Sequence, residues 1–294
     1  MADTIDKAHI TKFKLDYEHA VQQMLKVTGE TVTIDQHEGK RKRYTIQNEL
    51  DYVAYSSRLQ STTGTEAQYD FRWLLTAPYT LTPQWDRDDE FLLAEMQNPR
   101  SSLMQGLVYG YNRLCDDVVI TSLGAAAVTG EDGTGSTAYA GQSIAVNAVE
   151  SGSAVNSGLT LGKMRLLRKA FLDDNVDPGQ EIVWLIGPAQ LQDLQTISEY
   201  QSLDYNSKRA LVTGQPTPFL GFTFKVSTRL PVASDVRTTY AYTKRSMILN
   251  PGVRDVVFSE RADLRHARQI FSYARLGSMR LHDDEVGRVY CSEA

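Results

Sequence analysis

Histidine, cysteine and carboxylate side chains bind most protein metals, and their spacing in this sequence predicts no metal site. The five histidines are scattered and form neither an HExxH pair nor a cluster with cysteine; they are His9, His19, His37, His266 and His282. His282 stands beside Asp283-Asp284-Glu285 and could be a ligand. A solvated charged turn is the better interpretation of that run, so we expect neither a metal nor a cofactor.

Three glycine-rich segments match catalytic or phosphate-binding loops only in part. Gly130–Gly135 lacks the lysine that follows in a P-loop, and Gly158–Lys163 is followed by Met164 where Ser or Thr is required. Gly141–Ala145 misses the nucleophile-elbow pattern by one glycine. These segments therefore predict neither phosphate binding nor an activated serine.

Adjacent carboxylates are the remaining candidates for acid–base catalysis. Asp116-Asp117 and Asp173-Asp174 could exchange protons with a substrate, but paired acids at helix ends and turns are more often surface residues. We therefore expect no catalytic residue and no enzyme activity. An α/β enzyme whose site matches no known motif stays open as an alternative.

The sharpest charge feature is a run of four basic residues, Lys40, Arg41, Lys42 and Arg43. Such a run can bind nucleic acid, can be the solvated base of a hairpin, or can pair with acids of another subunit. Because the chain as a whole is acidic, we favour a contact between subunits. The acidic partners would then be Asp86, Asp88, Asp89 and Glu90.

The composition is that of a globular protein with an ordinary core. Of the 294 residues, 41% are hydrophobic and 23% charged, and 31 basic against 36 acidic residues give a net charge of −5. A mildly acidic chain does not hold nucleic acid by bulk electrostatics. We expect no membrane helix, which needs ~20 apolar residues, and no signal peptide. The two distant cysteines, Cys115 and Cys291, suit a reducing compartment.

The first two elements need partners outside themselves to bury their apolar side chains. Apolar residues recur at helical spacing from residue 10 to residue 24, which predicts a helix ending at residues 28–30. Residues 31–85 alternate apolar and polar side chains around a turn-forming stretch near residues 56–66, which predicts a long β-hairpin. Because an isolated ribbon is marginal in water, this hairpin must lie on another part of the protein or on another subunit.

The most helical stretch runs from Asp86 to Gly124: Asp86–Glu90 supply an acidic first turn, and a helix restarts at Asn98. Asn98 suits the N-cap and Pro99 the first helical position. An apolar stripe follows at spacings of three and four, formed by Leu103, Leu107, Tyr111, Leu114 and Val118. A helix of about 25 residues would be ~38 Å long. Residues 124–158 are rich in small and polar side chains and predict a surface connection with a short strand at residues 143–149.

Helices and strands alternate from residue 160 to residue 250. The pattern predicts helices starting near residues 161, 188 and 203, and a buried strand at Ile182–Ile186. This part therefore reads as an α/β or α+β domain of its own. Residues 253–291 are strand-like and predict long antiparallel strands.

Two ordered sets of motifs connect the sequence with a known family. The first set surrounds the predicted long helix: Trp85–Glu90, Asn98–Ser101, Arg113–Ile120 and Ala126–Gly130. The second follows in order: Asp204–Asn206, Ala210–Gly214, Phe219–Phe222, Leu276–Leu281 and Asp284–Val289. Each motif alone has low specificity, but their joint order resembles that of tailed-bacteriophage major capsid proteins, which have the Hong Kong 97 phage capsid fold.

This resemblance implies an α+β fold in four parts. Residues 1–30 would be an N-arm helix, and residues 31–85 an extended E-loop hairpin that lies on an adjacent subunit. Residues 86–154 and 245–294 would form the peripheral domain, with a long spine helix and long strands. Residues 155–244 would be the axial domain. The N-arm and the hairpin would then be buried on neighbouring subunits.

The resemblance also implies a structural role. The chain would be a major capsid subunit that self-assembles into hexamers and pentamers of an icosahedral shell. Its partners would be further copies of itself, scaffold and portal proteins, and double-stranded DNA enclosed without sequence-specific binding, with no membrane involved. It would be found in the virion after assembly in the host cytoplasm. A portal or decoration protein is a further alternative.

Overall fold

The computed structural model describes residues 23–52, 54, 58, 64, 66–86, 99–150, 152–201 and 216–293, without the side chains of residues 99–102 and 201. The chain divides into two compact units. The first comprises Met1–Leu25, Thr80–Arg113 and Arg254–Ala274, and the second comprises Lys26–Tyr79, Leu114–Val253 and Arg275–Ala294. No helix in the described ranges is long and apolar enough to cross a membrane.

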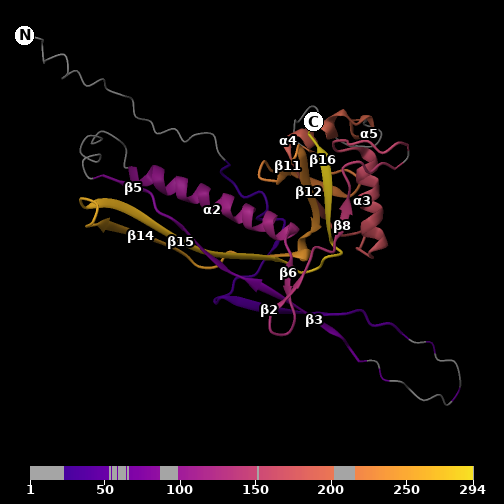
Figure 1. The fold of residues 1–294 in the computed structure, drawn as a ribbon, viewed down its shortest axis with the longest axis horizontal. Coiled ribbons are helices and arrows are strands. Elements are labelled where there is room, and N and C mark those ends of the chain that lie inside the picture. The colour runs from indigo at the N-terminus through magenta and orange to yellow at the C-terminus, as the bar shows by residue number, and fades with distance from the viewer. Residues whose placement is uncertain are drawn as a thin grey trace, which may run out of the picture. The chain divides into compact units, whose positions relative to one another are not determined.

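The first unit is built on a β-hairpin. Strand β14 (Arg254–Arg261) pairs antiparallel with the first part of β15 (Ala267–Arg280), and the short β5 (Gln84–Trp85) pairs with the same part of β15 (Figure 1). The guanidinium of Arg254 lies 4.8 Å from the ring centroid of Tyr111, which belongs to the first part of α2. The expected long antiparallel strands are confirmed.

The expected long helix is α2 (Pro99–Gly124), and it begins at the proline because that residue suits the first helical position. In the second unit, the buried face of α2 is not the predicted stripe. Buried side chains here are Cys115, Asp116, Val119, Ile120 and Leu123, whereas Leu114 and Val118 are half-buried. In this part of the helix the predicted stripe is therefore the less covered face, whereas Leu107 of the same stripe, in the first unit, is buried.

The main sheet of the second unit has the strand order β10-β9-β12-β16-β8, with β11 beside β12. Its strands are β8 (Gln142–Ile144), β9 (Ile182–Ile186), β10 (Phe222–Val226), β11 (Val232–Ala233), β12 (Val236–Thr243) and β16 (Val286–Ser292). The pairs β9–β10 and β8–β16 are parallel, and β12 is antiparallel to both β9 and β16. Strand β16 belongs to this sheet although it follows the others by more than forty residues.

Helix α3 (Leu161–Asp173) runs beside this sheet, and α4 (Pro188–Thr196) and α5 (Ser198–Gln201) follow β9 (Figure 1). Every residue of β9 is buried, as its apolar run predicts. The core contains Met164, Leu167 and Phe171 of α3 together with Trp184, Phe222, Phe224, Val289 and Cys291. The Trp184 ring meets the Phe222 ring edge-on, with 4.9 Å between the centroids.

Smaller sheets complete the second unit. Strand β1 (Thr33–Ile34) pairs with β13 (Met247–Asn250), which follows the 3-10 turn Lys244–Ser246 and pairs with the last part of β15. A four-stranded sheet has the order β2-β3-β6-β7, from β2 (Arg41–Gln47), β3 (Tyr69–Leu75), β6 (Ala127–Thr129) and β7 (Gly135–Thr137). Strand β4 (Ala77–Leu81) follows β3 and pairs with β15.

Several sequence expectations need correction or fall outside the described residues. Residues 23–30 are not helical, so no helix reaches residues 28–30 as expected, and residues 1–22 lie outside the described part. The strand expected at 143–149 is shorter, because β8 ends at Ile144. The predicted helix at 203–212 and most of the hairpin tip at 56–66 are also outside it.

Candidate assembly interface

The basic run begins the ribbon formed by β2 and β3. These strands pair antiparallel from Arg41 opposite Leu75 to Gln47 opposite Tyr69, and the amide of Asn48 continues the ladder by donating to the carbonyl of Gln68 at 3.0 Å. Because successive side chains of a strand point to opposite faces, the three basic residues that lie in β2, Arg41, Lys42 and Arg43, cannot share one face. The ribbon divides them between an inner and an outer face.

On the inner face, Lys42 is paired within the chain. Its Nζ lies 2.5 Å from Oδ2 of Asp35, which also accepts a hydrogen bond from the Tyr44 hydroxyl at 2.5 Å. These two hydrogen bonds, that from Lys42 first, lower the pKa of Asp35, and burial with the same contact raises the pKa of Tyr44. The neighbouring Leu74 is fully buried in a small core cluster. Lys42 therefore serves the subunit's own packing.

On the outer face, two arginines lie over aromatic rings of β3. The guanidinium carbon of Arg41 is 4.9 Å from the Trp73 ring centroid, and that of Arg43 is 4.7 Å from the Phe71 centroid. Both contacts are diagonal across the strand pair, within the reach of long side chains. Both arginines are exposed, and neither has a carboxylate partner among the described residues. Nη1 of Arg41 donates to the carbonyl of Asp132 at 3.2 Å, and cation–π stacking leaves the other N–H groups of the guanidinium accessible along its edge.

The turn between β6 and β7 supports Trp73. The indole Nε1 donates to the carbonyl of Gly130 at 2.7 Å, and a Cβ on Gly133 would lie 3.0 Å from the ring. Gly133 also has a φ of +68°, a conformation that favours glycine. The glycine-rich segment Gly130–Gly135 thus joins β6 to β7 and packs on the Trp73 ring.

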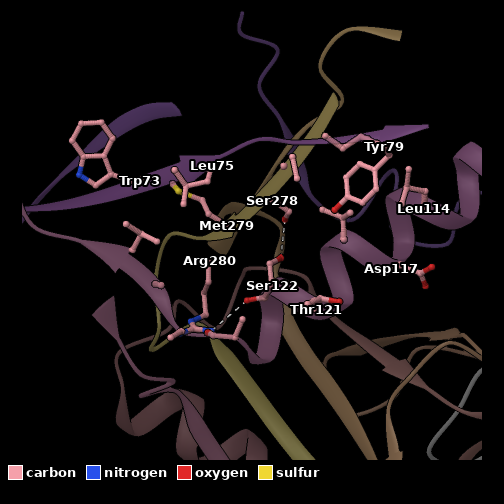
Figure 2. A pocket seen from close by; sticks show the side chains of 18 residues that line it. Trp73, Leu75, Tyr79, Leu114, Asp117, Thr121, Ser122, Ser278, Met279 and Arg280 are labelled. Atoms are coloured by element: carbon pink, nitrogen blue, oxygen red, sulfur yellow. Dashed lines mark hydrogen bonds between the residues drawn. The ribbon is translucent and has the colours of Figure 1, made fainter. Parts of the chain in front are cut away.

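A groove of about 370 Å³ continues the outer face of the ribbon. Figure 2 shows Trp73, Leu75 and Tyr79 along one wall and Leu114 of α2 along the other. The half-buried side of α2, including Val118, completes that wall, while Ser122 and Ser278 hydrogen bond to each other at 2.9 Å below it. Leu114 and Val118, the last two members of the predicted stripe, therefore face this groove.

A buried ionic network holds the ribbon and the end of α2 in place. The Asp283 carboxylate accepts from Nε of Arg280 through one oxygen and from Nη2 of Arg72, on β3, at 2.6 Å through the other. Nη1 of Arg280 donates to the carbonyls of Leu123 and Ala125, both at 2.9 Å. These carbonyls end the helix and have no partner within it, so Arg280 acts as a cationic cap.

The prediction of a solvated charged turn at residues 282–285 is therefore wrong. Asp283 is 9% exposed and Glu285 is 5% exposed, and Glu285 accepts from the Thr243 hydroxyl and from Arg245. Burial lowers the pKa of His282 and raises that of Asp284. Sequence reasoning missed this network because Arg72 and Arg245 lie 211 and 40 residues from the acids that they contact, although Arg280 is only three residues from Asp283.

The carboxylate pair Asp116-Asp117 is likewise not a surface pair. Asp116 is completely buried and accepts from the amides of Val27 and Thr28, both at 3.0 Å, and from the Thr28 hydroxyl at 2.7 Å. Asp117 pairs with Arg229 instead. The two acids therefore fix separate segments and share no substrate site. Of the other pair, Asp174 accepts from Gln142 at 2.5 Å.

The acidic residues expected to face the basic run are only partly described. Asp86 directly follows β5 and is exposed. Asp88, Asp89 and Glu90 lie outside the described residues. The contact between the basic run and these acids therefore remains a prediction. Among the residues that the structure does describe, no group of three or more His, Cys, Asp or Glu side chains could hold a metal ion.

The fold is that of bacteriophage capsid shells. The chain is similar to the cyanophage Pam1 capsid (TM-score 0.74, 10% identity, 100% of both chains) and to the capsid of cyanophage P-SCSP1u (0.70, 13%, 100% of this chain and 96% of that one). The mature capsid of bacteriophage PhiM1 is also similar (0.70, 12%, 97% and 93%). These identities are low, so the structures establish the fold alone.

Family membership comes from the sequence. The model of the phage capsid protein family matches residues 5–293, and the chain belongs to this family. No curated protein matches the sequence. The resemblance to phage capsid proteins and the α+β capsid fold are thereby confirmed. The family is a structural rather than an enzymatic one, which agrees with the lack of catalytic motifs.

Proposed function

We propose that this chain is the major subunit of a phage head, and that it self-assembles into hexamers and pentamers that tile an icosahedral shell around double-stranded DNA. Assembly would occur in the host cytoplasm, with scaffold and portal proteins as further partners. Heterologous contacts that close into rings suit such tiling, because many moderate interfaces add up to a stable shell.

The observation that carries this proposal is the outer face of the β2–β3 ribbon. This face presents Arg41, Arg43 and Trp73 beside two strongly exposed apolar side chains, Leu75 at 47% and Tyr69 at 53%. Arginine and aromatic side chains are enriched where proteins bind one another. The face therefore suits a contact with a neighbouring subunit, and Arg41 and Arg43 are the members of the basic run that would make it.

The four parts implied by the family supply roles for the other elements. We assign residues 1–30 to an N-arm, 31–85 to an E-loop, 86–154 with 245–294 to a peripheral domain, and 155–244 to an axial domain. The hydrogen bonds from Val27 and Thr28 to Asp116 would set where the N-arm leaves the subunit. The net charge of −5 suits a wall that encloses DNA without gripping it.

Sedimentation velocity and electron microscopy of the purified protein, alone and with its scaffold, test this function. We expect capsomers or closed shells. A monodisperse monomer at every concentration and salt would refute self-assembly. Rings of a single size, or binding only to preformed shells, would point instead to a portal or a decoration protein.

A further inference from the structure

We infer that strand β14 pairs edge to edge with β14 of a second copy of this chain, antiparallel and about a twofold axis centred on Val257. Such a contact rests on the proposed self-assembly and specifies one interface within it. It uses neither the β2–β3 ribbon nor the groove beside that ribbon. The partner is therefore the same strand of another subunit, in one register.

The outer edge of β14 is open within the subunit. In the sheet order β1-β13-β15-β14 this strand comes last, and no described strand pairs with its other side. Neighbouring N–H and C=O groups of a strand alternate in direction, so half of its residues direct theirs away from β15. An eight-residue edge is a template for a further strand, and soluble proteins either blunt such an edge or cover it.

The middle of this edge is not blunted. The strand contains no proline and no lysine, and it pairs with β15 over all eight residues without a bulge. Val257 is 44% exposed and Phe258 is 53% exposed, although they point to opposite faces of the strand. Exposed apolar side chains at the middle of a regular open edge indicate a strand that is covered in the assembled protein.

The two ends of β14 carry complementary charges. Arg254 stacks on the Tyr111 ring and has no carboxylate partner among the described residues. At the other end, the carboxylate of Glu260 lies 3.0 Å from the ring of His266, which carries a charge only when it is protonated. When two copies of the strand pair antiparallel, the positive end of each lies beside the negative end of the other.

Two of the three registers that centre the strands on each other are unfavourable. An axis at the midpoint of the strand sets Arg254 opposite Arg261, and like charges that lie directly opposite are destabilising. An axis centred on Phe258 sets Arg261 opposite an acid, but Arg261 is already paired with Asp263 in its own chain. That register also sets Val256 opposite a charged side chain at two positions.

The register centred on Val257 fits both the charges and the apolar residues. It sets Arg254 opposite Glu260. On the same face it sets Val256 opposite Phe258, and each pair occurs twice because the contact is symmetric. Opposite charges, and aromatic side chains facing β-branched ones, are combinations that stabilise neighbouring strands. On the other face, Val257 lies opposite its own copy.

The remaining pair of this register also matches. Asp255 lies opposite Ser259, whose hydroxyl oxygen accepts a hydrogen bond from Nε2 of Gln269 at 2.8 Å. That contact leaves the hydroxyl hydrogen free to donate to the facing carboxylate. Every residue from 254 to 260 therefore has a matching neighbour across the axis, along ~23 Å of strand.

A twofold pairing of this kind closes on itself. It occupies the open edge of both copies, so no third strand can add, and the edge is removed as a site of aggregation. A single pair of strands is marginal in water. The contact is therefore expected in the assembled protein, where the other interfaces already hold the two copies together.

Disulfide formation at the axis tests the contact in the assembled protein. In Val257→Cys, the Cα atoms of the two facing residues would be ~4.5–5.5 Å apart, which is within the range of a disulfide. We expect diamide to produce a disulfide-linked dimer, seen on a non-reducing gel. The parent protein is the background control, because its two cysteines, Cys115 and Cys291, are buried.

Phe258→Cys is the matched control for the register. This residue is more exposed than Val257, so chance collisions would link it at least as fast. In the proposed register its two copies are diagonal neighbours ~7–8 Å apart, beyond the reach of a disulfide. We therefore expect Val257→Cys to form dimers at least ~10-fold faster. Should Val257→Cys fail to assemble, an equimolar mixture of Arg254→Cys and Glu260→Cys copies must form the mixed dimer instead.

A charge exchange in the Val257→Cys background tests the pairs at the two ends. Arg254→Glu should slow dimer formation at least ~5-fold at low salt, because it sets two acids opposite each other twice. Adding Glu260→Arg to the same chain should restore the rate. Both variants lose the stacking on Tyr111, so the restoration reports the contact alone. Arg261→Glu, the same charge change on the same strand, should have a smaller effect because Arg261 pairs within its own chain.

The outcomes separate this contact from the proposed function. A parent protein that stays monomeric at every concentration and salt refutes both self-assembly and the contact. If the parent assembles but Val257→Cys forms dimers no faster than Phe258→Cys, the contact is wrong while self-assembly stands. Faster dimer formation by Phe258→Cys would overturn the register, and a double charge variant as slow as Arg254→Glu alone would overturn the pairing of the two ends.

Discussion

Replacing Asp283 by Asn should destabilise the subunit more than any surface change of similar size. The substitution keeps the shape of the side chain and removes the one negative charge that the side chains of Arg72 and Arg280 share. The Arg280 side chain is fully buried and that of Arg72 is 14% exposed, so water cannot take over the lost pairing at Arg280. The variant leaves two positive charges in a site built around an anion.

The burial of this ion pair sets the expected size of the effect. Removing one partner of a buried ion pair costs about 3–5 kcal/mol, because the remaining charge stays buried without compensation. A loss of about 3 kcal/mol lowers the folding equilibrium constant roughly 160-fold, at 1.36 kcal/mol per factor of ten. Arg280→Met should cost a similar amount, since the carbonyls of Leu123 and Ala125 then lose their donor. The two losses should be non-additive by at least ~1 kcal/mol, because both remove the same contact.

Urea unfolding followed by tryptophan fluorescence measures these losses, at several protein concentrations so that assembly does not add to stability. Asp263→Asn is the matched control. Asp263 pairs with Arg261 two residues away on the exposed hairpin of the first unit, and we expect no measurable change there. Equal midpoints for Asp283→Asn and Asp263→Asn, or strict additivity with Arg280→Met, would refute the buried network as a source of stability.

Three further predictions follow from the anchors and the core. Asp116→Asn replaces an acceptor oxygen by an NH2 group that faces the amides of Val27 and Thr28. The lost hydrogen bonding lowers the free energy of local opening by about 2 kcal/mol, so tryptic cleavage after Lys26 should accelerate at least ~10-fold. An unchanged cleavage rate would contradict the role of Asp116 in holding this segment. Replacing residues 56–66 by a short Gly-Ser linker should leave the unfolding temperature of the subunit nearly unchanged, because changes of loop length cost little free energy. The same variant should fail to form closed shells in electron micrographs. An unfolded variant or normal shells would count against this prediction. Burial raises the pKa of Cys291 to about 12 from 9.0. The contribution of this thiol to the free energy of unfolding therefore falls as the pH rises above 9.0, where the thiol ionises in the unfolded chain but not in the folded one. At pH 8, mass spectrometry should find no alkylation of Cys291 until urea is added.

Local patterns predicted the elements whose neighbours in sequence determine them. Helix α2 follows from Pro99 and a regular apolar stripe, and β9 follows from five consecutive apolar residues. The β2–β3 ribbon follows from alternation on both sides of a polar tip. In each case a period of 3.6 or 2 residues fixes the type of element without reference to the rest of the chain.

Contacts between distant segments account for what the sequence did not predict. Asp116 and Asp283 look like surface acids by composition, yet Thr28 lies 88 residues from Asp116, and Arg72, which shares Asp283 with the nearby Arg280, lies 211 residues from it. The division of the basic run also needed the register of β2, which places Lys42 beside Asp35 and Arg41 over Trp73. A charge run read along the chain carries no information about which face each side chain takes.

The position of β16 in the main sheet has a consequence for synthesis of the subunit. Its residues Val286–Ser292 separate β12 from β8, so the sheet cannot close until the ribosome has translated them. At about 5–20 residues per second, β8 waits ~7–30 s for this neighbour. During that interval β12 and β8 present open edges, and the core around Val289 and Cys291 is incomplete. A nascent subunit therefore lacks its finished sheet until β16 has been translated, which delays premature contacts between chains on one polysome and exposes the unfinished sheet to aggregation.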